Sequence, residues 1–123
     1  KRLAEWNRRR RQLAGIYSEI LRPLQRLRLP AIDELDSHVF HLYVIEHPER
    51  DALRKFLKDQ RIESMIHYPF LLHQQRLFRS AEQQVLPVAE RLVSRLLSLP
   101  LYPQLTDTEV RTVANAIVEF EQK

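Results

Sequence analysis

Seven prolines limit where regular elements can run in this 123-residue chain. Proline has no backbone N–H, so it ends a helix unless it lies in the first turn. Residues 3–22 carry apolar side chains at spacings of three and four, which predicts an amphipathic helix that Pro23 ends. No capping residue precedes this helix, so we expect the chain to be part of something longer. Residues 23–37 are expected to form a connector.

Three short segments are rich in the residue types that favour strands. Residues 38–45 read HVFHLYVI, which predicts a strand that is covered on both faces. Residues 61–68 are closed by Pro69 and predict a second, shorter strand. Residues 98–101 are interrupted by Pro100 and predict a short edge strand.

Further helices are expected between and after these strands. Pro48 suits the first turn of a helix that reaches about Asp59, and Pro87 suits the first turn of another whose apolar stripe reaches Leu97. Thr106 and Glu109 stand in the capping-box relation at the start of the last helix. This order of helices and strands predicts an α+β fold or α/β sandwich in which helices pack on a small sheet.

Composition indicates a folded chain but excludes several kinds of site. Hydrophobic residues make up 44% and charged residues 29%, as in globular proteins, and this length suffices for a single domain with one core. Cysteine is absent, which excludes disulfides and thiolate metal sites and is compatible with a cytoplasmic location. No apolar run approaches the ~20 residues of a membrane helix. Gly15 is the only glycine, which excludes glycine-rich phosphate loops.

The basic run Arg8–Arg11 is the one dense cluster of charge in a chain of net charge +4. A basic helix can bind phosphates nonspecifically, so weak nucleic-acid binding is one alternative function. However, successive helical residues are rotated by about 100°, which spreads these arginines around the axis. No aromatic platform for bases lies nearby. The sequence therefore disfavours a nucleic-acid partner.

The histidines are the other candidates for chemistry. His38 and His41 are three residues apart, so on a strand they would point to opposite faces and could not bind one metal ion. A histidine such as His41 among apolar neighbours is more often a hydrogen-bonded core residue. His67, Tyr68 and His73 form a denser cluster where a strand runs into a loop, which is a common place for sites. Composition alone leaves open whether this cluster is a site or a small apolar core.

Several segments follow one another in a recognisable order, namely HLYVI at residues 41–45, then RDAL, IHYPFLLHQQ and LPVAERLVSRLLSLPLYPQLT. In this order they resemble the DegT/DnrJ/StrS family of sugar aminotransferases, and the resemblance extends from one end of the chain to the other. The first helix is similar as well, because the family's RR-x-x-A-x-x-Y-x-x-x-L pattern is matched by Arg10, Arg11, Ala14, Tyr17 and Leu21.

The resemblance implies a fold-type-I aminotransferase that depends on pyridoxal phosphate, of which residues 1–123 are the carboxy-terminal small domain. It implies that residues 1–22 are a linking helix and that residues 38–123 form the core, with about four helices on a largely antiparallel three-stranded sheet. The large cofactor-binding domain is then absent from the chain. The family moves an amino group from glutamate to a keto group of a nucleotide-linked sugar, and its active sites lie between the subunits of a homodimer.

The resemblance also assigns roles to residues. His67, Tyr68 and His73 match the family's HYP-x-x-x-H segment, so they are expected to contact the substrate, and His41 is a weaker candidate. No catalytic, cofactor-binding or metal-binding residue is expected in this chain. None of its lysines has the sequence context of the family's Schiff-base lysine, so the isolated chain is expected to be inactive. The alternative is a non-catalytic binding or interaction domain that kept the fold.

Two positions depart from the family's pattern. The family usually has glycine where this chain has Arg61, and often proline where it has Leu71. A glycine at position 61 would end the preceding helix with a residue of positive φ. Arg61 must therefore adopt a costly conformation, or the helix must end differently. Either outcome weakens any transfer of sugar specificity from the family.

Overall fold

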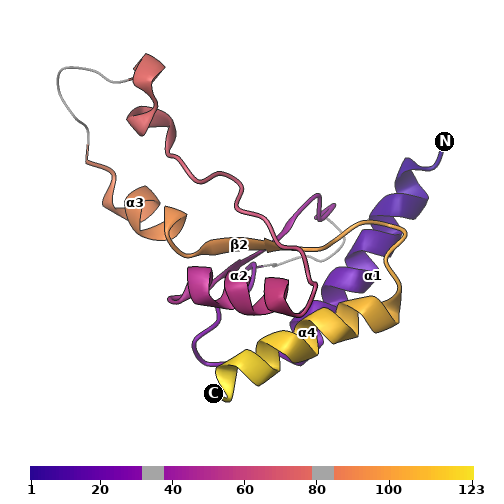
Figure 1. The fold of residues 1–123 in the computed structure, drawn as a ribbon. Coiled ribbons are helices and arrows are strands. Elements are labelled where there is room, and N and C mark those ends of the chain that lie inside the picture. The colour runs from indigo at the N-terminus through magenta and orange to yellow at the C-terminus, as the bar shows by residue number, and fades with distance from the viewer. Residues whose placement is uncertain (32–37, 79–84) are drawn as a thin grey trace.

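The computed structural model describes residues 1–31, 38–78 and 85–123. Parts of the predicted connector and of the loop before Pro87, at residues 32–37 and 79–84, lie outside the described residues. The described chain contains four helices, two strands and two short 3-10 turns, and Figure 1 shows how they are arranged. Their bounds are Leu3–Leu21 for α1, Tyr43–Glu46 for β1, Arg50–Asp59 for α2, Leu72–Gln74 and Arg76–Phe78 for the 3-10 turns, Pro87–Val93 for α3, Leu96–Leu99 for β2 and Asp107–Glu121 for α4.

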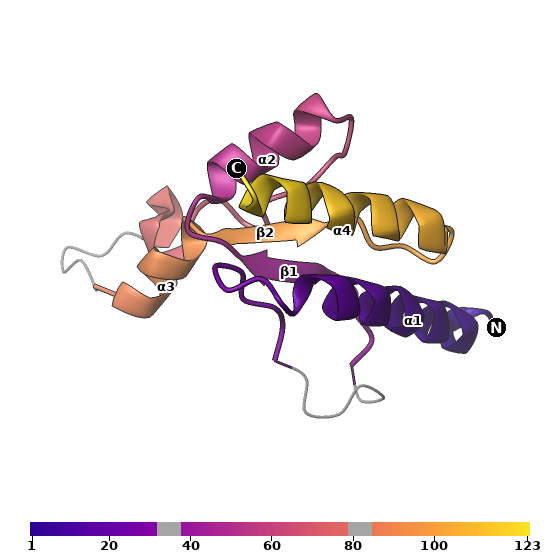
Figure 2. The same cartoon turned by 90° about the horizontal axis from the view of Figure 1, so that it is seen from below.

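The two strands pair antiparallel and form a small sheet. Tyr43 is paired with Leu99, and Glu46 with Leu96. In Figure 1, α1, α2 and α4 lie on one side of this sheet, and Figure 2 shows α2 and α4 beside β2 and α1 beside β1. The α+β class predicted from the sequence is confirmed.

The core lies between the sheet and these helices. Tyr17, Tyr43 and Phe40 are fully buried and form a chain of ring contacts. The Tyr17 hydroxyl donates to the carbonyl of Pro100 at 2.9 Å, and the Tyr43 hydroxyl lies 2.9 Å from Oγ of Ser18. Burial raises the pKa of both phenols above the ordinary value, because the phenolate form would lose its hydration. These satisfied hydroxyls fix α1 against the sheet.

Polar contacts fix both ends of α4. At its start, Thr106 and Glu109 form the capping box that the sequence predicts, and Arg9 of α1 donates to Oδ1 of Asp107 at 2.7 Å. At its end, Nε2 of the fully buried His47 lies 2.7 Å from Oε1 of Glu121. α4 is therefore anchored to α1 at one end and to the segment after β1 at the other.

The structure corrects the predicted three-stranded sheet, because the described residues contain two strands. Of residues 61–68, only Met65 pairs with a strand, through an isolated bridge to Ser98. The residues just before it complete the end of α2, where Arg61 has a positive φ. Pro69, which follows the segment, has no N–H with which to continue the pairing to β2. The segment therefore contributes one bridge where a strand was predicted.

The boundaries of the other two strands also differ from the prediction. The first begins at Tyr43 instead of residue 38, because the φ of 47° at Phe40 interrupts the extended backbone. The strand predicted at residues 98–101 is β2, which covers Leu96–Leu99. Pro100 ends it because proline cannot donate to the ladder. Leu97, predicted to lie in a helical stripe, is paired with Ile45 and fully buried in the sheet.

Candidate functional site

His67 and Tyr68 lie where the chain leaves the bridge to β2 and enters the arm, by which we mean residues 69–78 and 85–93. Figure 1 shows the arm extending away from the sheet. His67 is half-buried and Tyr68 is 77% exposed. Their rings meet edge to face, with centroids 5.7 Å apart, and the peptide bond between them is cis. An imidazole and an accessible phenol are thus held side by side at the base of the arm.

A buried serine of β2 holds the His67 ring. Nδ1 of His67 lies 2.9 Å from Oγ of Ser98, and Ser98 is only 4% exposed. The backbone N–H and carbonyl of Ser98 are both bonded to Met65, at 2.8 and 3.0 Å. The bridge at Met65 therefore brings His67 over the strand that carries its hydrogen-bond partner.

His73 lies farther along the arm, in the first 3-10 turn. Its Nε2 is 3.5 Å from Oε1 of Glu90 in α3, and its side chain is 18% exposed. The same carboxylate oxygen accepts the backbone N–H of Leu86 at 3.1 Å. In the described part of the chain, no hydrogen bond, ion pair or ring contact joins His73 to His67 or Tyr68. The cluster is therefore divided between the base and the middle of the arm.

Arginines tie α3, and with it the arm, to the rest of the fold. Arg91 of α3 donates to Oε1 of Glu46 in β1 at 2.8 Å. The buried Arg50 of α2 donates from Nη1 to the carbonyl oxygens of Val93 and Leu96, at 3.2 and 2.9 Å. These bonds satisfy carbonyls at the turn between α3 and β2, where the helix can no longer do so. The returning half of the arm is thus fixed to the sheet.

His41 lies in the loop before β1 and is exposed, so the expectation of a hydrogen-bonded core histidine was wrong. The loop itself is well fixed. Arg10 of α1 donates to the carbonyl of Val39 at 3.1 Å, and Nδ1 of His38 accepts the N–H of Phe40 at 3.0 Å. These bonds leave His41 on the surface beside a buried aromatic residue, accessible to a ligand.

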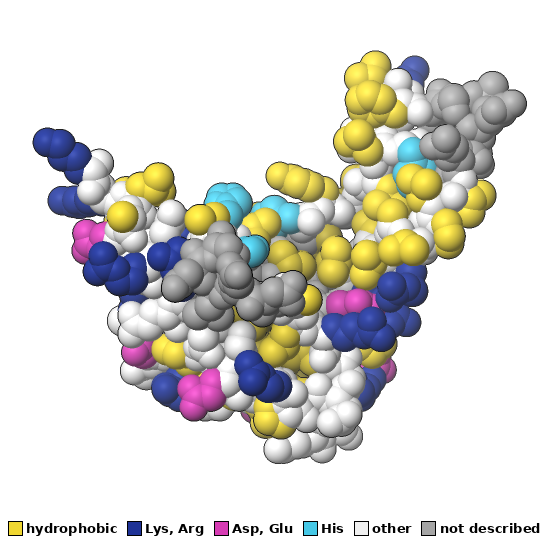
Figure 3. Space-filling view, turned by 180° about the vertical axis from the view of Figure 1, so that it is seen from behind, with side chains coloured by type: hydrophobic (Ala, Val, Ile, Leu, Met, Phe, Trp, Pro, Cys, Tyr) yellow, Lys and Arg dark blue, Asp and Glu magenta, His cyan; other side chains and the backbone are white. Residues whose placement is uncertain are grey.

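Seen from behind, the surface is hollowed between the start of α1 and the arm (Figure 3). Histidine side chains gather in this hollow, and hydrophobic side chains cover much of the arm. A continuous exposed apolar surface on a globular chain marks a region that packs against another surface. The exposed large apolar residues of this region are Tyr68, Phe70, Leu72, Leu77, Phe78, Val85, Leu86 and Val88.

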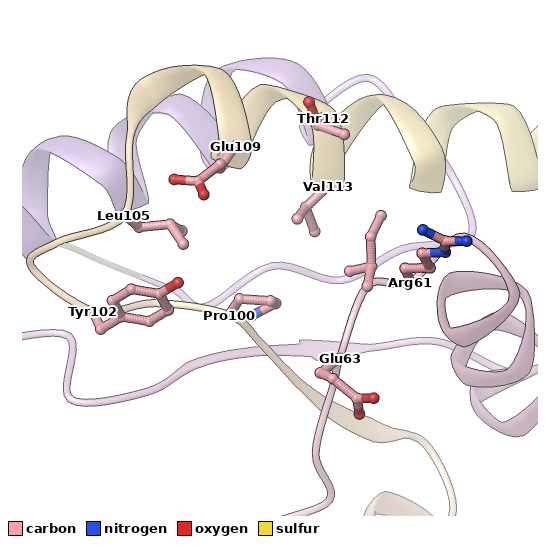
Figure 4. A pocket seen from close by; sticks show the side chains of 9 residues that line it. Arg61, Glu63, Pro100, Tyr102, Leu105, Glu109, Thr112 and Val113 are labelled. Carbon is pink, nitrogen blue, oxygen red and sulfur yellow. The ribbon is translucent and has the colours of Figure 1, made fainter.

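Two pockets lie away from these residues. The first, of about 360 Å³, is situated between the end of α2 and the start of α4. Figure 4 shows Tyr102 and Leu105 on one side of it and Arg61 and Glu63 on the other. The second, of about 400 Å³, adjoins Trp6 near the start of α1. Neither is lined by a histidine or a lysine.

The residues present do not form a site for pyridoxal phosphate. That cofactor is held as a Schiff base by a lysine, but Lys1, Lys55, Lys58 and Lys123 are all exposed. Lys123 instead pairs with Glu119 at 3.3 Å and lies over an aromatic ring of α2. Among residues 1–31, 38–78 and 85–123, no cluster of three histidines or acidic residues could hold a metal ion.

Sequence reasoning missed Ser98 and Glu90, the residues that orient His67 and His73. One signal was available for the first of them. Ser98 is a single hydroxyl in the apolar run LLSLPL, and a polar group in a buried strand requires a partner. Which partner it takes depends on the bridge to Met65, and that bridge is a long-range contact with no local pattern.

Comparisons with known proteins point to one family. A model described as the DegT/DnrJ/EryC1/StrS aminotransferase family matches residues 1–118. A dTDP-3-amino-3,6-dideoxy-alpha-D-galactopyranose transaminase of Aneurinibacillus thermoaerophilus is 36% identical over 93% of this chain. A UDP-N-acetyl-3-dehydro-alpha-D-glucosamine 3-aminotransferase of Acidithiobacillus ferrooxidans is 41% identical over 94% of this chain. The crystal structure of S. venezuelae DesV in complex with a ketimine intermediate matches 99% of this chain with a TM-score of 0.92 and 31% identity.

The match covers only part of each relative. The chain spans 31% of the length of each of the two transaminases and 33% of the DesV chain. In the described part of the chain, no helix is both long and apolar enough to cross a membrane.

Proposed function

Because this chain belongs to the DegT/DnrJ/EryC1/StrS aminotransferase family, we propose that it is the carboxy-terminal small domain of an enzyme that aminates a nucleotide-linked sugar. In this proposal the enzyme moves an amino group from glutamate to a keto group of the sugar. The names of two relatives, one acting on a dTDP-linked and one on a UDP-linked sugar, support this class of substrate. The activity is proposed for the whole enzyme, since the chain spans about a third of these relatives.

One observation carries the substrate-binding role, which is the placement of His67 and Tyr68 together at the base of the arm. Their rings are in contact, and Tyr68 is 77% exposed although it is large and partly apolar. A phenol and an imidazole offer hydrogen bonds in directions that sugar hydroxyls and phosphate oxygens can use. We assign His67 and Tyr68 to substrate contact, with His41 and His73 as further contacts.

The arm supplies the second part of the proposal. Its exposed apolar surface, from Phe70 to Val88 within the described residues, would be costly in water unless another surface covered it. We assign this surface to contact with the larger part of the enzyme, and the arm then closes one side of the substrate site. His73, paired with Glu90 of α3, then belongs to the same side of the site.

The cofactor is proposed to lie outside this chain. Aminotransferases of this family depend on pyridoxal phosphate, which supplies an electron sink for amino transfer when it is bound. The exposed lysines of this chain do not fit the Schiff-base role, so the isolated chain is expected to be inactive. A homodimer of the whole enzyme and a cytoplasmic location remain predictions.

The test uses the whole enzyme that contains this chain, assayed with glutamate and a set of dTDP- and UDP-linked keto sugars. Substituting His67→Gln and Tyr68→Phe should each raise KM for the sugar by about tenfold, the usual effect of one lost substrate hydrogen bond. KM for glutamate should change much less. Tyr102→Phe is the matched control, because Tyr102 is also an exposed tyrosine but borders the pocket beside α4.

Two results would contradict the proposal. If neither substitution changed KM for any sugar that the enzyme aminates, His67 and Tyr68 would not contact substrate. If the whole enzyme transferred no amino group to any of these sugars, the non-catalytic binding domain would become the better account.

A further inference from the structure

The contact between Ser98 and His67 fixes which nitrogen of the imidazole carries its proton. Ser98 is 4% exposed, and in the described residues the only hydrogen-bond partner of its hydroxyl is Nδ1 of His67, at 2.9 Å. The backbone of Ser98 is separately satisfied by Met65. A buried hydroxyl that cannot reach water must donate to the one acceptor available, or its proton is left without a partner.

Nδ1 is therefore the acceptor in the neutral ring, and Nε2 carries the proton. If Nδ1 carried the proton instead, it would donate to Oγ, and the Ser98 proton would be buried without an acceptor. No described residue bonds Nε2 of His67, so this N–H is presented to the open side of the ring. Tyr68 packs against the same ring edge to face and limits its rotation.

We infer that Ser98 is a positioning residue that holds His67 as an Nε2–H donor, and that His67 recognises an acceptor oxygen of the substrate. This inference rests on the proposed function, because it names the chemistry of the same site. The oxygen can be a sugar carbonyl, a sugar hydroxyl or a phosphate oxygen, but it must accept a hydrogen bond. Ser98 of the buried strand β2 thereby makes His67, at the base of the arm, selective for hydrogen-bond acceptors.

The tautomer can be measured directly on the 123-residue chain by two-bond ¹H–¹⁵N correlation of the His67 ring near neutral pH. The wild type should show a pyrrole-type nitrogen at Nε2 and a pyridine-type nitrogen at Nδ1. Ser98→Ala should move both shifts toward the values of a free, exchanging imidazole, and Ser98→Thr, which keeps the hydroxyl, should retain the wild-type pattern. A pyrrole-type Nδ1 in the wild type would overturn the inference.

Ser64→Ala is the matched control. Ser64 is 6% exposed and precedes Met65, and its Oγ is buried without a partner in the described residues. Removing this hydroxyl should leave the His67 shifts unchanged. If Ser64→Ala moved them as much as Ser98→Ala does, the effect would come from general loosening of the segment, and the positioning role would be wrong.

A kinetic measurement on the whole enzyme keeps the inference testable if Ser98→Ala unfolds the isolated chain. Ser98→Ala should raise KM for the sugar by about two- to tenfold, the cost of ordering one freed side chain, and Ser98→Thr should restore it. An unchanged KM in Ser98→Ala, alongside a raised KM in His67→Gln, would reject the positioning role and keep the proposed function. A fixed tautomer with no effect of His67→Gln would reject the proposed function instead.

Discussion

Arg61 stands where the family usually has glycine, which leaves two outcomes: a costly backbone conformation or a different helix end. The structure shows Arg61 in the costly conformation. Its φ is 63°, and its N–H donates to the carbonyl of Lys58 at 2.9 Å while that of Ile62 donates to Leu57 at 2.9 Å. These are the two hydrogen bonds of a Schellman motif, in which the left-handed position is usually glycine. The helix therefore ends in a motif that favours glycine, and Arg61 adopts the left-handed backbone geometry with a side chain attached.

Arg61→Gly should stabilise the chain. Removing the side chain relieves the clash of a left-handed residue, and this gain exceeds the extra freedom of glycine in the unfolded state, so the free energy of unfolding should rise by about 1 kcal/mol. Chemical denaturation measures it. Arg54→Gly, at an exposed position within α2, is the control and should lower stability by about 1 kcal/mol. A loss of stability in Arg61→Gly would show that the arginine makes a compensating contact.

At the scale of elements, the start of α4 depends on a charged capping box. Oε2 of Glu109 accepts the backbone N–H of Thr106 at 2.8 Å and its hydroxyl at 2.7 Å. These bonds, the backbone bond first, hold the pKa of Glu109 below its ordinary value. A carboxyl whose pKa is lowered by folding stabilises the fold where it is ionised in both states, and this contribution is lost as pH falls through the folded-state pKa.

Glu109→Gln isolates the charge, because an amide oxygen can accept the same two hydrogen bonds. Wild type should be the more stable protein at neutral pH, where glutamate near the helix start is favourable. The difference should begin to shrink below about pH 5, near the ordinary titration of glutamate, and vanish at more acid pH. Thermal melts of both proteins across that range measure it. A difference that stays constant with pH would mean that charge does not contribute to the cap.

The same scale shows where sequence patterns succeed and fail. α1 is confirmed nearly to the residue, and α4 begins where the capping box predicts, because an amphipathic period, Pro23 and the capping box are all local signals. The spacing of Leu96 and Leu97 from Leu92 predicts a helical stripe, although the same short apolar run also suits a strand. Pairing with β1 decides for the strand, and that is a contact between residues some fifty positions apart that no local window contains.

Local sequence patterns predict only part of the candidate site. The HYP-x-x-x-H segment predicts His67, Tyr68 and His73 as site residues, and the rings of His67 and Tyr68 are in contact at an accessible position. The patterns missed that His73 is separated from them and paired with Glu90, and that His41 lies outside the strand. Both features follow from how the arm and the loop before β1 pack on distant segments.

At the scale of the whole molecule, the arm's apolar surface should make the isolated chain associate. Leu77 is 86% exposed, so Leu77→Lys should reduce self-association and the binding of a hydrophobic dye without changing the free energy of unfolding by more than about 0.5 kcal/mol. Sedimentation of the chain over a range of concentrations measures the association. Gln74→Lys, an equal change of charge at a polar exposed position of the arm, is the control and should have little effect.

The opposite pattern would be informative. If the wild-type chain stayed monomeric and bound no dye, the arm would be folded back on itself in solution. Its surface would then be unavailable to the rest of an enzyme.

The account depends on His67 and Tyr68 bordering the substrate of a larger enzyme, and a crystal structure of that whole enzyme with its nucleotide-linked sugar tests this most directly. The predicted result is an acceptor oxygen of the ligand about 3 Å from Nε2 of His67, with Tyr68 beside it and the arm buried against the remainder of the protein. A sugar bound elsewhere, with His67 facing water and the arm exposed, would contradict the account.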